Sequence, residues 1–554
     1  MKSASSAVAS FLIGGASVIY LTAGFSLPSV HLRSLTSISL LLAAVMVFRK
    51  LSGLSVAGSG LFARLGYRVS NRPSLVTALL LLPILIVTTF RPLVLGAAFE
   101  DAGYVNQGMY QFFGKPWLHC DVCVANSFLG EHQSYTLFFG WLWLKVFSTP
   151  YSVPVFAAVL IAIFFKTLLR TFSKNLPPYA LSFLVLAVFL VRGFHGGFLY
   201  DFREDLLGAV FFGFMIAAVL KERWALGAVA FALAILSKET CALIAPALLP
   251  LVFVQLQMEN GSEGSPIIST EVSAKLSVRD GGKSRQLGFL ALYLGVALTG
   301  AYLSLVRGIH AWNPNPNAPS MIAVRLGHLG STLPEILKTA VLHPFQIFPY
   351  SGESSATGSL LRYLLHTLIP FLPLMVLAWN WAYFPGLIVL FGNLVSLAPS
   401  QRSMDFHYDL LVMPFFAYGL ALSLARNKSG LSRGRLAAAI LPFLILAGTS
   451  PLTNFYPHFK SRALILEARF MREESTKIPS SLPLMVDGVT YAQVVDRPEL
   501  RLFPVGGRGL KPTDDASDAI LRMSVYRANA GALSMWKKTA CSPSGETCRF
   551  SKEL

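Results

Sequence analysis

Long apolar runs recur along this chain and constrain its fold more than any other feature. Each run has about 20 residues with little charge, the length that a helix needs to cross the hydrocarbon core of a bilayer. Helices are expected because a helix satisfies its backbone hydrogen bonds internally in lipid. The 554 residues are 54% hydrophobic and only 13% charged. The sequence therefore predicts an all-α polytopic membrane protein, a helical bundle of about 13 spans.

The predicted spans are residues 7–28, 35–48, 75–98, 150–169, 178–194, 205–220, 225–238, 241–257, 287–306, 360–381, 384–399, 408–425 and 436–450. Lys and Arg residues fall mainly in short loops on one side of these spans, which is typical of cytoplasmic loops. The formal charge of +18 is therefore a topology signal, and we expect no nucleic-acid partner. We expect a multi-pass protein of the cell inner (plasma) membrane with a cytoplasmic N-terminus.

Three regions follow from this topology. Residues 1–74 hold two extra N-terminal spans and a basic cytoplasmic loop, and residues 75–450 form the membrane core with large extracytoplasmic loops at 99–149 and 307–359. Within the second loop, residues 333–348 are moderately apolar and are expected to lie on the membrane. Residues 451–554 are polar with strand-like pieces at 484–495 and 500–505, which predicts a small mixed α/β extracytoplasmic domain.

Four of the five cysteines form two close pairs on the outer side. Cys541 and Cys548 flank a Pro-Ser-Gly turn, and because the outer compartment is oxidising we expect a disulfide there. Cys120 and Cys123 form a lone C-x-x-C, for which a structural disulfide is favoured over a metal or redox role.

Basic residues are sparse on the outer side of bacterial membrane proteins, yet several are predicted there close to span ends. These residues are Arg192, Arg203, Lys238, Arg307 and Arg402. One interpretation is pairing with acidic neighbours, namely Asp201, Glu204, Asp205, Glu239 and Asp405. The other is a phosphate site, because guanidinium groups bind phosphate bidentately and a lipid-linked substrate carries its phosphate at this depth. The residues alone leave both open.

Asp101 follows an apolar run at the predicted outer membrane edge. It either caps the short helix that follows, where the helix dipole favours an acid, or acts as a general base on an acceptor hydroxyl. His132, His195 and His407 are also on the outer side, but their spacing fits no dedicated metal-binding motif. The sequence contains no nucleotide-binding glycine loop and no nucleophile elbow.

Several outer-side motifs together resemble a known family. They are Asp101-Ala-Gly-Tyr-Val-Asn-Gln107, Glu131-His132-Gln-Ser134, Tyr200-Asp201-Phe202-Arg203-Glu204-Asp205, Ser237-Lys238-Glu239, and His407-Tyr408 followed by Met413-Pro414-Phe415. They are similar to motifs of the uncharacterised prokaryotic membrane proteins grouped as domain of unknown function 2079, within the GT-C glycosyltransferase superfamily. The resemblance covers residues 74–505 and departs from the family pattern at Asn106, Gln133, Tyr135 and Arg203.

This resemblance implies a GT-C-like fold and an inverting glycosyltransferase on the extracytoplasmic face. Its donor would be a polyprenyl-phosphate sugar in the membrane lipid, often with a divalent cation (Mg²⁺ or Mn²⁺), and its acceptor a glycan, a lipid or a protein. Asp101 is then the expected general base, and Arg203, Lys238 and Arg402 bind the donor phosphate. Asp201, Glu204 and Glu239 orient these cations or a metal, while Gln107, His132 and His407 are further candidates for substrate contacts.

Two alternatives come from other functional classes. A transporter or flippase of a lipid-linked or anionic solute would need polar, broken helices that meet at the bilayer midplane, whereas the ionisable residues here gather on one side. A non-catalytic membrane assembly protein would use the region after Ser450 as its working part.

Overall fold

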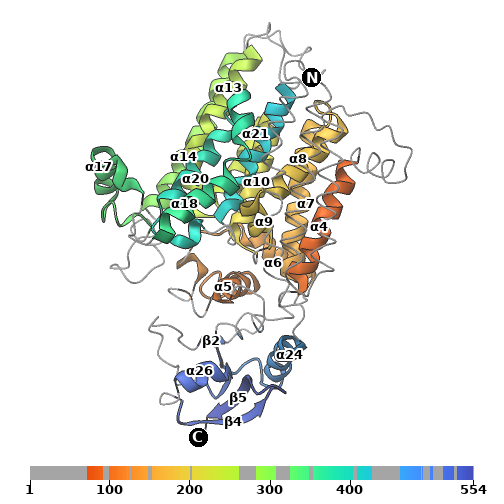
Figure 1. Cartoon of the computed structure of the whole chain (residues 1–554), viewed down its shortest axis with the longest axis vertical. Helices are drawn as coiled ribbons and strands as arrows, with labels where there is room; N and C mark the ends of the chain where they lie inside the picture. Colours follow the sequence, from red (N-terminus) through yellow and green to blue (C-terminus); the bar gives the residue numbers. More distant parts are fainter. Residues whose placement is uncertain are drawn as a thin grey trace.

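The computed structural model describes residues 72–90, 99–120, 123, 127–130, 132–147, 152–199, 202–260, 282–306, 325–348, 354–402, 408–426, 462–487, 490, 494, 500–502, 516–529 and 533–552. They form a mostly helical bundle, a short helix beyond one end of it, and a small α/β domain at the C-terminal end of the chain (Figure 1). We call the described residues from 462 to 552 the tail domain.

The bundle and its connections contain α-helices and short 3-10 helices. In chain order they are α4 (Pro73–Phe90), α5 (Phe99–Tyr110), η3 (Phe128–Gly130), α6 (Leu137–Val146), α7 (Ser152–Phe172), α8 (Pro178–Leu190), α9 (Arg192–Leu199), α10 (Glu204–Leu220), α11 (Trp224–Ile235), α12 (Glu239–Ile244), η4 (Ala245–Leu248), α13 (Leu249–Asn260), α14 (Gly282–Val306), α17 (Leu333–Leu342), η6 (Pro344–Ile347), α18 (Ser354–Thr367), α19 (Leu372–Leu377), α20 (Tyr383–Val395), η7 (Pro399–Arg402), η8 (Tyr408–Leu411) and α21 (Met413–Arg426).

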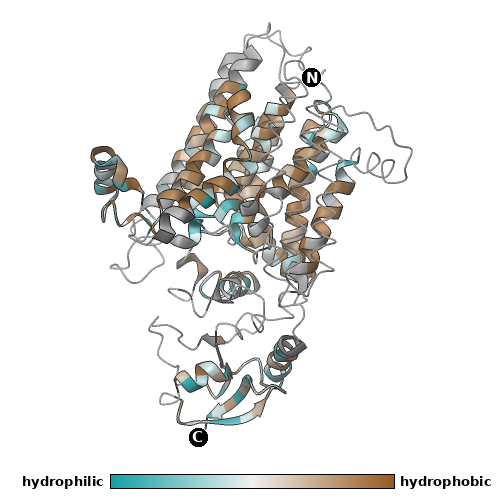
Figure 2. Cartoon of the chain, in the orientation of Figure 1, coloured by the Kyte–Doolittle hydropathy of each residue, from teal (hydrophilic) through white to brown (hydrophobic). Residues whose placement is uncertain are grey.

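Helix α10 is the central element of the bundle. It packs against α7, α11 and α21, and nearly all of its side chains are buried, as expected for a helix that is hydrophobic on every face. Figure 2 shows bundle helices that are mostly hydrophobic, with a group of hydrophilic residues at the end that faces α5. The first turn of α10 is acidic and contains Glu204 and Asp205.

The described helices follow the predicted spans in position but not in number. Among them, α7 alone combines sufficient length with the apolar composition of a membrane span, so the prediction of about 13 spans is not confirmed. Several predicted spans are divided: 178–194 becomes α8 and α9, 241–257 becomes α12, η4 and α13, and 360–381 becomes α18 and α19. The predicted spans 7–28, 35–48 and 436–450 lie outside the described residues.

The tail domain contains a mixed sheet with helices α24 (Arg462–Thr476) and α26 (Met523–Ala528). Its strands are β1 (Leu484–Val486), β2 (Leu500–Leu502), β3 (Asp518–Arg522), β4 (Trp536–Cys541) and β5 (Thr547–Lys552), in the order β2-β1-β3-β5-β4. Strand β1 is parallel to β2 and β3, and β5 is antiparallel to β3 and β4. The strand-like pieces expected near 484 and 500 thus begin two of the strands.

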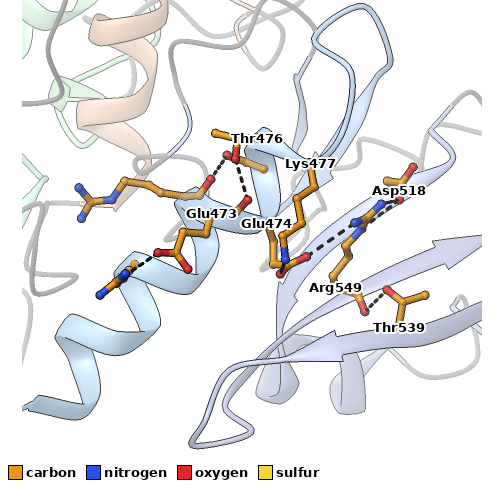
Figure 3. A network of polar contacts seen from close by, with 10 residues as sticks. Glu473, Glu474, Thr476, Lys477, Asp518, Thr539 and Arg549 are labelled. Atoms are coloured by element: carbon orange, nitrogen blue, oxygen red, sulfur yellow. Dashed lines mark hydrogen bonds and ion pairs between the residues drawn. The ribbon is translucent and has the colours of Figure 1, made fainter.

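Polar contacts fasten α24 to this sheet (Figure 3). Arg549 on β5 donates from Nη2 to Asp518 Oδ1 on β3 at 2.9 Å, and its Nη1 lies 3.6 Å from Glu474 Oε2 on α24. Lys477 also pairs with Glu474. A disulfide joins Cys541 to Cys548 across the β4–β5 hairpin, and a second joins Cys120 to Cys123 before α6.

Candidate functional site

A buried cluster of charged side chains lies where α10 and α12 begin. Lys238, the residue before α12, places its Nζ 2.8 Å from Glu204 Oε1 and 2.6 Å from Asp205 Oδ2. Arg203 Nη2 lies 3.3 Å from the same Glu204 oxygen. The side chains of Lys238 and Glu204 are only 2% and 0% exposed, so this is an ion-pair network with little solvent screening.

The linker before α6 adds a histidine to this cluster. His132 Nδ1 lies 2.9 Å from Glu239 Oε1, and its Nε2 lies 3.5 Å from Arg203 Nη2 and 3.9 Å from Glu204 Oε1. The backbone N–H of Gln133 donates to the second Glu239 oxygen at 3.3 Å. His132 therefore joins the α12 carboxylate to the α10 charges, and we name His132, Arg203, Glu204, Asp205, Lys238 and Glu239 the charged cluster.

The neighbouring charges alter the acidity of two carboxyl groups that precede the predicted spans. Burial raises the pKa of Glu239, but His132 and its hydrogen bond, followed by Lys238, outweigh this effect and lower the pKa to about 2. Burial likewise raises the pKa of Glu204, and Arg203, Lys238 and His132 together hold it well below its ordinary value. Both groups are therefore carboxylates at neutral pH. Glu204 Oε2 is buried without a hydrogen-bond partner among the described residues.

Arg402 has a different environment from the cations of the charged cluster. It lies at the end of η7, is 5% exposed, and donates from Nη1 to the backbone carbonyl of Ser396. Its Nε is buried without a hydrogen-bond partner, and no carboxylate of the described residues forms an ion pair with it. A buried guanidinium with so few partners is costly unless an anion compensates it.

A second guanidinium, Arg325, contacts Gln401, the residue that precedes Arg402. With the Gln401 amide assigned in the orientation that satisfies its neighbours, Arg325 Nε and Nη1 each donate to its oxygen at 3.0 Å, and its nitrogen donates to Ser396 Oγ at 2.7 Å. The Arg325 Cζ also lies 5.9 Å from the centre of the Tyr408 ring, within the range of a cation–π contact. We name Arg325 and Arg402 the guanidinium pair.

Another polar group is buried between four elements of the bundle. Asp409 on η8 accepts hydrogen bonds from the Tyr363 hydroxyl on α18 and, at 3.5 Å, from Asn393 Nδ2 on α20. Its carboxylate packs against Gly193 on α9, where an added Cβ would lie 2.8 Å from Asp409 Cγ. This carboxylate joins the elements around η8, and an acid within an apolar run is the signal that could have marked it in the sequence.

The structure places the other predicted site residues as follows. Asp101 stands in the first turn of α5, although its side chain is outside the described part of the chain, as are residues Asp201 and His407. Gln107 is on α5 and is completely buried. Sequence reasoning missed Arg325 because it lies far from Arg402 in the chain and no periodic pattern connects them.

Ligands for a divalent cation would come from His, Cys, Asp and Glu side chains. The described residues contain no group of three or more His, Cys, Asp or Glu residues arranged to hold a metal ion. The carboxylates of Glu204, Asp205 and Glu239 are occupied by Lys238 and His132. The described side chains therefore do not fit a metal site, and no step of the chemistry below depends on one.

The solved structures that match the chain include ArnT from a bacterium and an oligosaccharyltransferase from an archaeon. ArnT from Cupriavidus metallidurans bound to undecaprenyl phosphate is 13% identical, with a TM-score of 0.48 over 86% of this chain and 97% of that chain. The apo form gives a TM-score of 0.46 at 13% identity over 88% and 98% of the two chains. The apo oligosaccharyltransferase of Archaeoglobus fulgidus gives 0.38 at 12% identity over 86% and 74%.

TM-scores below 0.5 do not by themselves establish a common fold, and no protein of curated function matches the chain. The family comparison is decisive for the chain itself. A family model described as a predicted membrane protein matches residues 96–467, the region that holds the charged cluster, the guanidinium pair and Asp101. The chain belongs to the DUF2079 family of predicted membrane proteins.

Proposed function

We propose that this protein is a membrane glycosyltransferase of the GT-C type. It transfers a sugar from a polyprenyl-phosphate donor to a hydroxyl-bearing acceptor, a glycan, lipid or protein, on the extracytoplasmic face. The observation that carries the proposal is the guanidinium pair. Arg402 is buried without a carboxylate partner among the described residues, and a guanidinium in that state fits a phosphate, which it can bind through two parallel N–H donors.

The charged cluster supports a division of roles between the basic residues. The positive charges of Arg203 and Lys238 are already balanced by the carboxylates of Glu204 and Asp205. These two cations would therefore add little to the binding free energy of a donor phosphate. We therefore assign the phosphate contact to Arg402, and we assign a supporting role to Arg325, which contacts the adjacent residue Gln401. Arg203 and Lys238 hold the acidic first turn of α10 in place, while Asp201 and His407 remain candidates for substrate contacts.

The proposed reaction is a single displacement at the anomeric carbon of the donor sugar. Asp101 takes the proton of the acceptor hydroxyl, the acceptor oxygen forms the new glycosidic bond, and the bond from the anomeric carbon to the phosphate oxygen breaks. The guanidinium pair stabilises the negative charge that develops on the departing polyprenyl phosphate. His132, whose side chain is 12% exposed, is a candidate for a contact with the acceptor hydroxyl.

Binding of undecaprenyl phosphate to the full chain in nanodiscs tests this assignment. Arg402→Ala should weaken binding at least tenfold, because a hydrogen bond to a charged group contributes about 1.5–3 kcal/mol and about 1.4 kcal/mol is a factor of ten. The affinity of Arg402→Lys should lie between those of wild type and Arg402→Ala, since an ammonium keeps the charge but loses the bidentate geometry. Arg469→Ala, on an exposed tail residue, is the matched control.

Turnover tests the proposed base independently of binding. Asp101→Asn should retain undecaprenyl phosphate binding and lose sugar transfer from a lipid-linked donor by about 100-fold or more, the contribution of a positioned general base. Full activity in Asp101→Asn would remove Asp101 from the mechanism. Unchanged binding in Arg402→Ala would remove the guanidinium pair from the donor site.

A further inference from the structure

Helix α5, which carries Asp101, lies between the bundle and the tail domain (Figure 1). One side of it belongs to the bundle, because Val105 and Met109 are completely buried in the bundle's hydrophobic core. The Met109 side chain occupies the space beside Gly140 on α6, where an added Cβ would lie 3.1 Å from Met109 Cγ. The C-terminal half of α5 is thus anchored on α6.

Tyr104, closer to the first turn of α5, has contacts on both sides. It packs against the bundle core and also against a second hydrophobic core in the tail domain. That core consists of Met471, Ile478, Leu484, Val486, Val494, Leu500 and Ile520. Among the hydrophobic residues that the structure describes, Tyr104 is the one that packs against both cores.

The tail side of this contact is itself well braced. Met471 comes from α24, Leu484 and Val486 from β1, and Leu500 from β2. Helix α24 is fastened to the sheet by the Glu474–Arg549–Asp518 contacts in Figure 3. Ile520 comes from β3. Tyr104 therefore packs against a core shared by one helix and three strands, so the tail domain can resist movement of α5.

We propose that Tyr104 is a positioning residue through which the tail domain holds the first turn of α5 in place. Asp101 stands three residues before Tyr104 on the same helix, and residues at this spacing are neighbours on a helix surface. Fixing Tyr104 therefore fixes the backbone that carries Asp101. The catalytic consequence rests on the proposed role of Asp101, whereas the mechanical link between tail domain and α5 does not.

Hydrogen exchange on the full chain in nanodiscs measures the mechanical link without any substrate. Tyr104→Ala should raise amide exchange by about tenfold in both α5 and strands β1 and β2, because local opening becomes easier when packing is lost on both sides of the contact. Tyr104→Phe keeps the ring and should stay within about twofold of wild type. Faster exchange in the tail domain with no change in α5 would overturn the proposal.

Tyr526→Ala provides the matched control within the tail domain. The Tyr526 ring stacks on Phe550 at 4.4 Å and borders a separate hydrophobic core of that domain. Its loss should accelerate exchange around β5 and leave α5 unchanged. An equal effect of Tyr526→Ala on α5 would show general loosening of the tail domain and would contradict a specific role for Tyr104.

Kinetics then test the catalytic consequence. Tyr104→Ala should lower kcat by about tenfold and change KM for the lipid-linked donor by less than about twofold, because misplacing a reacting group affects the chemical step more than donor binding. A Tyr104→Ala variant with faster exchange in α5 and wild-type kcat would overturn the positioning role. If wild-type protein transfers no sugar, the proposed function fails while the exchange result still decides whether Tyr104 links the two domains.

Discussion

Replacing Lys238 by Met tests whether the charged cluster is held together as the structure describes. Lys238 Nζ lies 2.8 Å from Glu204 Oε1 and 2.6 Å from Asp205 Oδ2, and its side chain is 2% exposed. Methionine has a similar length and no charge, so the substitution removes the cation without opening a large cavity. The two carboxylates at the start of α10 then lose their shared partner.

The size of the effect follows from which charges remain. Removing one partner of a buried ion pair costs about 3–5 kcal/mol, because the other charge stays buried without compensation. Glu204 keeps Arg203 at 3.3 Å, so we expect the lower end, about 3 kcal/mol. A second change, Asp205→Asn, removes a negative charge that Lys238 balanced and should restore about 0.5–3 kcal/mol, the usual coupling energy of residues in one network.

Equilibrium unfolding in mixed detergent micelles, followed by circular dichroism, gives the free energies for wild type, both single variants and the double variant. Lys221→Met is the matched control, because Lys221 follows the opposite end of α10 and, among the described residues, its Nζ forms no ion pair with a carboxylate and donates to the Arg170 carbonyl at 3.4 Å. That control should stay within about 0.5 kcal/mol of wild type. A Lys238→Met variant as stable as the control, or strictly additive effects in the double variant, would refute the network.

Two further predictions concern packing and pH. Gly193→Ala should lower the free energy of unfolding by about 1–3 kcal/mol through overpacking, because its Cβ would lie 2.8 Å from Asp409 Cγ. Gly288→Ala is the control, since its Cβ would meet nothing within 4 Å, and it should be neutral or slightly stabilising. Equal melting temperatures of the two variants would contradict the contact between Gly193 and Asp409. The pKa of Glu239 is lowered from 4.5 to about 2, so the stability that its carboxylate contributes is complete above pH 4.5 and is lost as the pH falls toward 2. Glu239→Gln should therefore flatten this part of a plot of melting temperature against pH. An unchanged slope would exclude Glu239 as a source of the pH dependence.

The apolar runs of the sequence predicted well where the bundle helices lie, but they did not predict which runs are divided into two or more helices. Hydropathy identifies which residues leave water, but it does not show where the backbone turns within an apolar run. The run at 241–257 is interrupted at Ala245–Leu248, where a 3-10 helix containing Pro246 separates α12 from α13. Proline removes a backbone donor and tightens the turn. The ten-residue helix α6 was too short to register as a span.

The candidate site was predictable where its partners are neighbours in sequence. Pairing of the outer cations with acids was one of the two interpretations that the sequence left open. Arg203 pairs with its neighbour Glu204, whereas Lys238 pairs with Glu204 and Asp205 on another helix, and its neighbour Glu239 contacts His132. The structure supports pairing for Arg203 and Lys238. Arg402 differs because its hydrogen bond is with the Ser396 carbonyl and involves no acid. The hydrogen bonds from Arg325 to the neighbouring Gln401 join residues far apart in the chain and leave no local pattern.

The position of Tyr104 between two hydrophobic cores also orders the events of biosynthesis. Helix α5 is synthesised before β1, β2 and the other parts of the tail core that its Tyr104 contacts. Until those strands have been made and folded, α5 lacks its second contact. In the proposed mechanism, sugar transfer would therefore be slow in a chain whose strands β1 and β2 have not yet folded.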